Sequence, residues 1–279
     1  MSKFKLFIWL PAIAALFPVL MVFTNSFMSG FEISTRYTHL VRPGNIFFAD
    51  EIHFVRMTLL PDFVTLSQYS ELLFNNPVYI GKLWNSIALA LPIVVGQLMI
   101  SAPAAYAFEM SRFRYKEWVY LVYIIVMLMP LQVSLVPNFV TAQALGLADS
   151  RLAIILPGIF NPFGVFIMRQ YLRNLPRDYI EAAFIDGAGH LKAFILVIAP
   201  LFKTAAAALM LLTFVENWNL VEAPHLFLNA ATEPLSVYLA SADAEIIFAA
   251  SFFYLLPCVL IFLYGQEHMI QGIQLSGVK

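Results

Sequence analysis

Few residues of this chain have the types and spacing needed for catalysis. The five histidines are scattered without metal-ligand spacing, and the single cysteine, Cys258, excludes an intramolecular disulfide. The only Gly-Lys pair, Gly81-Lys82, lacks the preceding glycine and the following Ser or Thr of a phosphate-binding P-loop. No serine-hydrolase or metalloprotease motif is present. We therefore expect no enzyme activity, metal or cofactor in this chain, and if ATP is used, another polypeptide must bind it.

One polar stretch, in the loop of residues 176–200, lies between two long apolar segments. Asp178 suits a helix N-cap, and Glu181 three positions later could close a capping box. Three residues of this helix share one face: Ile180, Ala183 and Phe184. Gly187 and Gly189 then allow a tight, left-handed turn. The pattern predicts a short helix along a membrane surface. Taken alone, the composition favours an amphipathic helix that only anchors its loop.

The composition places the chain among membrane proteins. Of its 279 residues 61% are hydrophobic and 12% charged, and the mean hydropathy is +0.80, whereas about 25% of residues are charged in a soluble domain. The net charge of −1 gives no indication of a nucleic-acid partner.

Six apolar stretches approach or reach the length of about 20 residues that a helix needs to cross the bilayer. They are roughly Leu6–Met28, Asn85–Phe108, Trp118–Val140, Leu152–Tyr171, Ala193–Val215 and Ile246–Tyr264. Lipid offers no hydrogen-bond partner to a free backbone amide, so these spans must be helices. The predicted fold class is an all-α membrane protein with six transmembrane helices. The first span is longer than a signal-peptide core and no A-x-A site follows it, so we expect it to remain uncleaved.

The distribution of basic residues predicts the orientation. Lys and Arg gather before the first span, between spans two and three, and around the junction of spans four and five: Lys3, Lys5, Arg112, Arg114, Lys116, Arg169, Arg173, Arg177 and Lys192. The loop of residues 216–245 carries neither Lys nor Arg. Since positive loops stay inside, both termini and residues 176–200 are expected in the cytoplasm, with the loop 29–84 outside.

Two places could contribute to a path through the membrane. Asn161-Pro162 is the strongest candidate for a helix break, and broken helices line the paths of many transporters. Trp218 and Asn219 follow the fifth span, where they could line an outer vestibule. The alternatives remain open: the break could serve packing, and Trp218 could belong to an interfacial aromatic belt.

The stretch around Glu181 also resembles the EAA loop of ABC-importer permeases, whose pattern is E-A-A, three residues, G, nine residues, I-x-L-P. Five of the seven positions match: Glu181, Ala182, Ala183, Gly187 and Pro200. Val197 replaces Ile, and Ala199 replaces Leu. The resemblance implies the type I importer fold with a cytoplasmic coupling helix. It implies contact with an ATPase through Glu181, Ala182, Ala183, Phe184, Asp186, Gly187 and Ala188.

Softer matches resemble the carbohydrate branch of that family, typified by the maltose-transport permeases. They are Asn85-Ser86, Ala104–Phe108 with Arg112-Phe113-Arg114, Trp218-Asn219 and the tail from Gly272 to Lys279. The chain departs from the usual pattern at Glu109, where Ala is common, and at Met110, where Arg is common. The resemblance implies a prokaryotic plasma-membrane importer for a carbohydrate. Its partners would be a second permease, an ATPase dimer that binds ATP and Mg, and an extracytoplasmic solute-binding protein.

The division expected along the chain is a first span in 1–28, an outer loop in 29–84, a permease core in 85–270 and a tail in 271–279. An importer of a non-sugar solute is the nearest alternative. A secondary transporter or channel is a further one, although neither inverted repeats nor intramembrane charge is apparent. A membrane scaffold, in which the cytoplasmic helix merely anchors, is the third. The sequence does not name the solute or say which permease of a pair contacts it.

Overall fold

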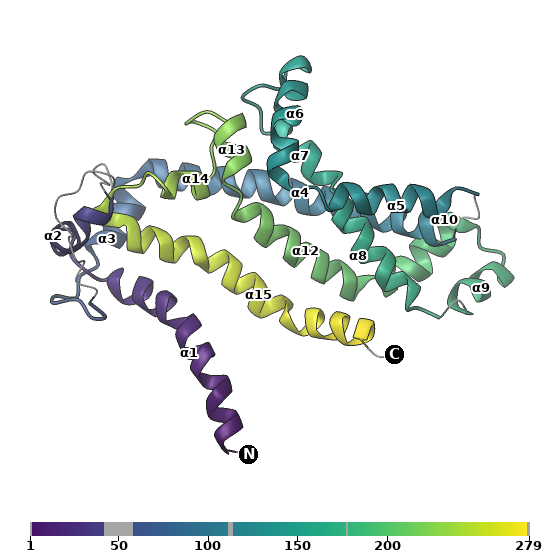
Figure 1. Cartoon of the computed structure of the whole chain (residues 1–279), viewed down its shortest axis with the longest axis horizontal. Helices are drawn as coiled ribbons and strands as arrows, with labels where there is room; N and C mark the ends of the chain where they lie inside the picture. Colours follow the sequence, from purple (N-terminus) through teal and green to yellow (C-terminus); the bar gives the residue numbers. More distant parts are fainter. Residues whose placement is uncertain (1, 42–57, 111–113, 177, 278–279) are drawn as a thin grey trace. The chain divides into compact units, whose positions relative to one another are not determined.

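The computed structural model describes residues 2–41, 58–110, 114–176 and 178–277. Within these ranges every regular element is a helix, which confirms the all-α prediction (Figure 1). Arg112, Phe113, Arg177 and Lys279, named above for their charge or for the family resemblance, lie outside the described residues.

The chain divides into two compact units. One comprises Met1–Trp84 with Leu235–Pro257, and the other Asn85–Pro234 with Cys258–Lys279. Two long helices, α4 (Pro77–Met110) and α15 (Ile247–Gly277), run from one unit into the other. The first unit also contains α1 (Ser2–Asn25), α2 (Gly30–Val41), α3 (Ser67–Ser70), a π-helical turn (Glu71–Asn75), α14 (Leu235–Leu239) and a 3-10 turn (Ala244–Ile246).

The second unit contains the remaining helices. They are α5 (Lys116–Met127), α6 (Leu131–Ala144), α7 (Leu152–Ile159), α8 (Pro162–Arg173), α9 (Asp178–Ile185), α10 (His190–Ala193), a π-helical turn (Phe194–Ile198), α11 (Ala199–Leu201), α12 (Lys203–Trp218) and α13 (Glu222–Phe227).

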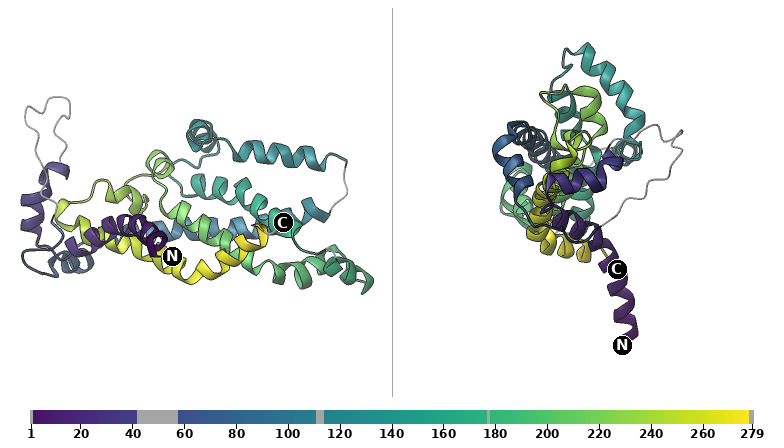
Figure 2. Two further views of the ribbon diagram at one scale, coloured as in Figure 1. Left: turned by 60° about the horizontal axis from the view of Figure 1, so that its bottom comes forward. Right: turned by 90° about the vertical axis from the view of Figure 1, so that its left-hand side faces the viewer.

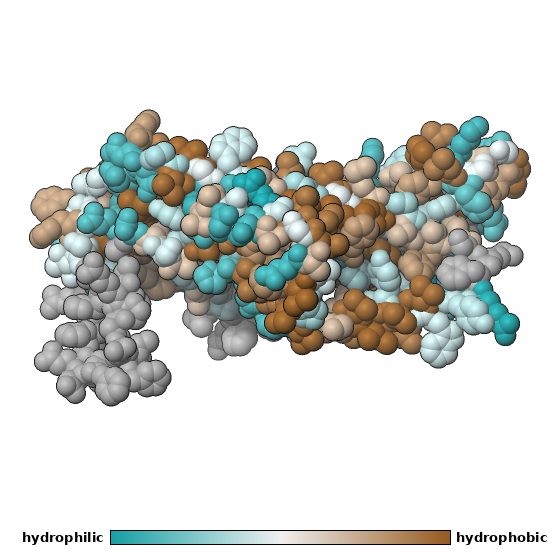
Figure 3. Space-filling model, turned by 90° about the horizontal axis from the view of Figure 1, so that it is seen from above, coloured by the Kyte–Doolittle hydropathy of each residue, from teal (hydrophilic) through white to brown (hydrophobic). Residues whose placement is uncertain are grey.

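Each of the six predicted spans coincides with one helix or one pair of helices. Three segments are long and apolar enough to cross a membrane: Pro77–Met110, Leu152–Arg173 and Ile247–Gln266. Two bent pairs meet the same criteria, and α1 supplies the shorter apolar segment Pro11–Asn25. Broad apolar areas are correspondingly visible on the surface (Figure 3). Such areas suit lipid or partner subunits rather than water.

The sharpest bends differ from the expected one. The third predicted span is the pair α5 and α6, bent by 98°, and the fifth is bent by 71° before α12 (Figures 1 and 2). Pro130 holds an extended backbone (φ −63°, ψ 143°) between α5 and α6, so no helix continues through it. At Asn161 the helix is interrupted, yet Leu152–Arg173 still forms a single apolar segment of 22 residues. The positions of the prolines in the sequence did not show at which of them the chain would change direction.

Glycines bring α4 close to α7 and α8 in the second unit. A Cβ on Gly96 would lie 2.6 Å from Ile159, and one on Gly158 would lie 2.9 Å from Ile93. A Cβ on Gly164 would meet the hydroxyl of Ser101 at 2.2 Å. Small residues at helix contacts are the usual means of close packing in membranes, where no hydrophobic force drives helices together.

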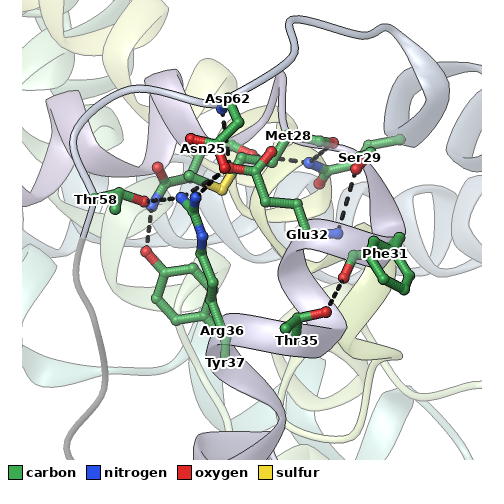
Figure 4. Close-up of polar contacts among 11 residues, drawn as sticks. Asn25, Met28, Ser29, Phe31, Glu32, Thr35, Arg36, Tyr37, Thr58 and Asp62 are labelled. Carbon is green, nitrogen blue, oxygen red and sulfur yellow. Dashed lines mark hydrogen bonds and ion pairs between the residues drawn. The ribbon is translucent and has the colours of Figure 1, made fainter.

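A polar cluster organises the first unit (Figure 4). Arg36 of α2 pairs with Glu32 at 2.8 Å, donates to Thr58 Oγ1 at 2.6 Å and pairs with Asp62. Asp62 in turn donates its backbone N–H to Glu32 at 3.0 Å. These bonds tie residues 58–62, which have no helix of their own, to α2.

Candidate functional site

The short helix predicted after the fourth span exists as α9, and its C-terminus is closed by a Schellman turn. Gly187 adopts φ +81°, in the left-handed region that glycine accepts at little cost. The N–H of Ala188 donates to Ala183 O at 2.9 Å, and that of Gly187 donates to Phe184 O at 3.1 Å. This pair of bonds satisfies carbonyls at the helix end and fixes the direction in which the chain leaves.

The two sides of α9 differ in burial. Ile180 (3% exposed) and Ala183 (8%) face inward, and Ile180 belongs to an apolar cluster with Leu172 and Ile198. Glu181 and Ala182 are exposed. The two adjacent alanines of the motif therefore do different things: Ala183 seats the helix on the bundle, and Ala182 belongs to its free surface. The α9 surface, Glu181, Ala182 and Ile185, offers one carboxylate, one methyl and one large apolar side chain (Ile185 is 84% exposed).

The return of the chain toward the bundle is held by aromatic contacts. His190, the first residue of α10, lies edge-on to Phe184 with ring centroids 5.0 Å apart. Its Nδ1 is 3.5 Å from the hydroxyl of Tyr106 on α4. Beside these residues is a groove of about 890 Å³ whose lining includes Tyr106, Glu109, Glu181, Phe184, His190 and Phe194. The loop is thus a packed element next to a groove.

The remaining predicted residues of this loop lie at or near the surface. Asp186 is exposed and Ala188 is half-buried, both within the turn after α9. Asp178 is the first described residue of α9 itself. The position before it, 177, lies outside the described residues, so the predicted N-cap stays a prediction.

Asn161 and Trp218, which the sequence placed on a possible path, both have structural contacts. Asn161 Oδ1 accepts from the N–H of Phe163 at 3.0 Å and so caps α8, while its carbonyl accepts from Gln97 at 3.5 Å. Trp218 is 1% exposed and stacks on Phe214 at 5.2 Å. The two lie on different elements, Asn161 before α8 and Trp218 at the end of α12.

Asn219 follows Trp218 and remains exposed. Its side-chain amide donates to Val215 O at 2.7 Å, which satisfies a carbonyl at the end of α12. The role of all three residues in a path stays a prediction, although the side chains of Asn161 and Asn219 already satisfy backbone groups at the beginning of α8 and the end of α12.

Among the described residues of the second unit, sequence reasoning missed one buried charge. Arg169, counted above only as a basic residue near a loop, is 3% exposed. Its Nη2 donates to Glu117 Oε1 at 3.0 Å, and its Nε donates to Glu109 Oε2 at 3.4 Å. A signal was available, because Glu109 stands where the resemblance leads one to expect Ala, and an acid at the end of an apolar helix needs a partner.

Comparison with known proteins agrees with this arrangement. Residues 97–271 match the family described as "Binding-protein-dependent transport system inner membrane component". The arabinooligosaccharides transport system permease protein AraQ of Bacillus subtilis is 30% identical over 226 residues, covering 78% of this chain and 80% of that protein. The sn-glycerol-3-phosphate transport system permease protein UgpE of Pectobacterium atrosepticum is 31% identical over 209 residues, covering 71% and 74%.

A solved structure shows the same fold. It is the crystal structure of a bacterial ABC transporter involved in the import of the acidic polysaccharide alginate, with a TM-score of 0.78 and 24% identity over 96% of this chain and 95% of that one. Members of the matched family are multi-pass inner-membrane transport subunits, which work with an ATPase and a solute-binding protein and are not themselves enzymes. With well over half of its length matched, this chain belongs to the family of binding-protein-dependent transport system inner membrane components.

Proposed function

We propose that this chain is the permease subunit of an ATP-driven importer for a carbohydrate, and that α9 is its contact with the ATPase. The observation that carries the proposal is the seating of α9. Ile180 and Ala183 are fixed in the bundle, the Gly187 turn defines the helix end, and the α9 surface is left open. A force applied to that surface would reach the bundle because the helix cannot slide over a packed contact without breaking it.

Charge distribution supports the orientation that this role needs. The basic residues before the first span and in the loops around α9 favour the cytoplasmic side for both termini and for α9. The loop 216–245, which lacks Lys and Arg, would then lie outside, where a solute-binding protein arrives. A second homologous permease would complete the path, and ATP and Mg would be bound by the ATPase, because no P-loop occurs in this chain.

Alternating access gives the mechanism. ATP binding closes the ATPase dimer, which draws the two α9-type helices together and turns the spans toward the outside. A partner shifts such an equilibrium only by its differential affinity for the two states. Reversing a 1:99 population takes about 5.5 kcal/mol. A seated helix can transmit that difference, whereas an unanchored loop would yield first.

The proposed class of solute rests on what related permeases are named as transporting. Proteins 28–31% identical over most of their length include permeases for arabinooligosaccharides and for sn-glycerol-3-phosphate, so a neutral sugar and a sugar-like phosphate are both represented. Accumulation of radiolabelled arabinotriose, maltotriose and glycerol 3-phosphate by cells that express the complete operon would separate them. Accumulation of none of the sugars would refute the carbohydrate assignment.

Reversal of the charge at Glu181 tests the role of α9. Glu181→Lys, and independently the bulky Ala182→Leu, should leave the protein folded in the membrane but abolish uptake and copurification of the ATPase. Glu71→Lys is the matched control, because it reverses the charge of an exposed glutamate in the first unit. Gly187→Pro should also abolish uptake, since proline cannot adopt φ +81°. Normal uptake by the Glu181 and Gly187 variants would refute the coupling role.

A further inference from the structure

Arg169 joins three helices through one buried guanidinium. It lies on α8, its carboxylate partners Glu109 and Glu117 belong to α4 and α5, and its guanidinium carbon lies 3.7 Å from the ring centroid of Tyr120 on α5. The ring of Phe108, on α4, is 6.0 Å away. A guanidinium between two carboxylates and two aromatic faces combines ion pairing, hydrogen bonding and cation–π attraction in one fixed geometry.

This arrangement is costly, and stability alone is a poor reason for it. Removing a charged group from water carries a penalty that a buried ion pair often only just offsets. Here the Nη1 atom of Arg169 is buried with no hydrogen-bond partner among the described residues, so the offset is incomplete. Replacement of a buried ion pair by apolar side chains of similar volume is often neutral or stabilising. The ion pairs of Arg169 are directional, however, and so they hold the three helices in one register.

The position of Arg169 shows which motion this register would affect. Arg169 lies one turn before the end of α8, and the chain reaches α9 at Asp178. Met168 and Leu172, its neighbours on α8, belong to the apolar cluster that holds Ile180 of α9. Glu109 lines the groove beside Glu181 and Phe184. The C-terminal end of α8 is therefore attached to α9 by apolar packing, to α4 by both apolar packing and charge, and to α5 by the ion pair with Glu117 and the contact with Tyr120.

We infer that Arg169 is a positioning residue for coupling: it makes α4, α5 and α8 move as one body when α9 is displaced. The inference rests on the proposed function of α9 as the ATPase contact. Without the guanidinium, the apolar cluster, which includes Ala105 and Tyr106 of α4, would still carry motion from α9 into α4, α8 and α12, but without one fixed register. The helix α5, which contributes only Tyr123 at the edge of this cluster, would be free to lag. ATP would then be hydrolysed with less solute moved for each cycle.

The test measures ATP hydrolysis and uptake on the same proteoliposomes. They contain the complete importer, with both permeases, the ATPase and the solute-binding protein, and a labelled oligosaccharide that the wild type accumulates, arabinotriose in the first instance. The main variant is Arg169→Gln. The matched control is Arg173→Gln, which removes the same charge one turn later on α8, at an exposed position. The double swap Arg169→Glu with Glu109→Arg restores the pair in reverse.

Arg169→Gln should assemble with the ATPase and hydrolyse ATP, yet its uptake per ATP should fall at least about fivefold, the lower end of the usual range of coupling between sites. Arg173→Gln should keep the wild-type ratio, and the double swap should recover part of the loss. An unchanged ratio in Arg169→Gln, or an equal fall in Arg173→Gln, would overturn the inference.

A folding defect is separated from a coupling defect by a milder variant. If Arg169→Gln does not assemble, the near-isosteric Glu109→Gln takes its place under the same criteria, and a wild-type ratio there overturns the inference. Failure of the wild-type chain to copurify with any ATPase would refute the proposed function itself. That result is distinct from a normal complex whose ratio does not depend on Arg169.

Discussion

The turn after α9 contains two glycines that look alike in sequence and differ in geometry. Gly187 has φ +81°, whereas Gly189, two residues later, has φ −77° and ψ 169°, which any residue can adopt. A Cβ at either position would meet no atom within 4 Å. Replacing each glycine by alanine therefore isolates the free-energy cost of the backbone conformation, because neither variant introduces a steric contact.

The magnitude follows from that comparison. An L-residue in the left-handed region costs about 1–2 kcal/mol, and both alanines share the gain of about 0.4–1 kcal/mol that comes from a less flexible open chain. Gly187→Ala should thus destabilise the closed turn by about 1–2 kcal/mol relative to Gly189→Ala, which is roughly a 5- to 30-fold shift in population.

Hydrogen exchange followed by mass spectrometry can measure this shift in the purified protein. The amide of Ala188 donates to Ala183 O, so its protection reports the closed turn. In Gly187→Ala this amide should exchange roughly 5- to 30-fold faster than in Gly189→Ala, as the strain energy requires. Uptake should fall with it, less severely than in Glu181→Lys. Equal exchange rates in the two alanine variants would refute the argument that the left-handed turn holds α9 in place.

Two further predictions concern packing and the first unit. Gly164→Ala should lower the free energy of unfolding by about 1–3 kcal/mol, because the added methyl group overpacks against Ser101. Gly81→Ala, whose methyl group meets open space in a helix, should raise the free energy of unfolding by up to about 1 kcal/mol. Equal melting temperatures of the two variants would contradict both expectations. Arg36→Gln should free residues 58–62, with a loss of about 1.5–3 kcal/mol of local protection in hydrogen exchange, while Arg114→Gln, whose described contact is a ring 5.7 Å away, should change little.

Several conclusions were available from local sequence alone. Apolar length and the need to satisfy every backbone amide internally predicted the six helical segments. The EAA spacing located α9, and Gly187 predicted the left-handed turn that closes it. The lack of a P-loop indicated that any ATP must be bound by a partner. Each of these depends on a short window of residues, so no knowledge of the packing was needed.

Only the tertiary structure decided which residues are buried and where the helices bend. Sequence spacing placed Ile180, Ala183 and Phe184 on one helical face, and only the packing showed that Ile180 and Ala183 are buried while Phe184 stays 39% exposed. Among many prolines, the sharp bend fell at Pro130 rather than near Pro162.

Arg169 is the clearest case. Its partners lie 60 and 52 positions away in the chain, and no local pattern joins them. The sequence shows which side chains cannot lie in lipid without a partner, because the free-energy cost of removing a charged group from water is a property of each residue type. Which groups then meet is decided by how helices from distant parts of the chain pack, because a buried charge is satisfied only by the atoms that packing places beside it.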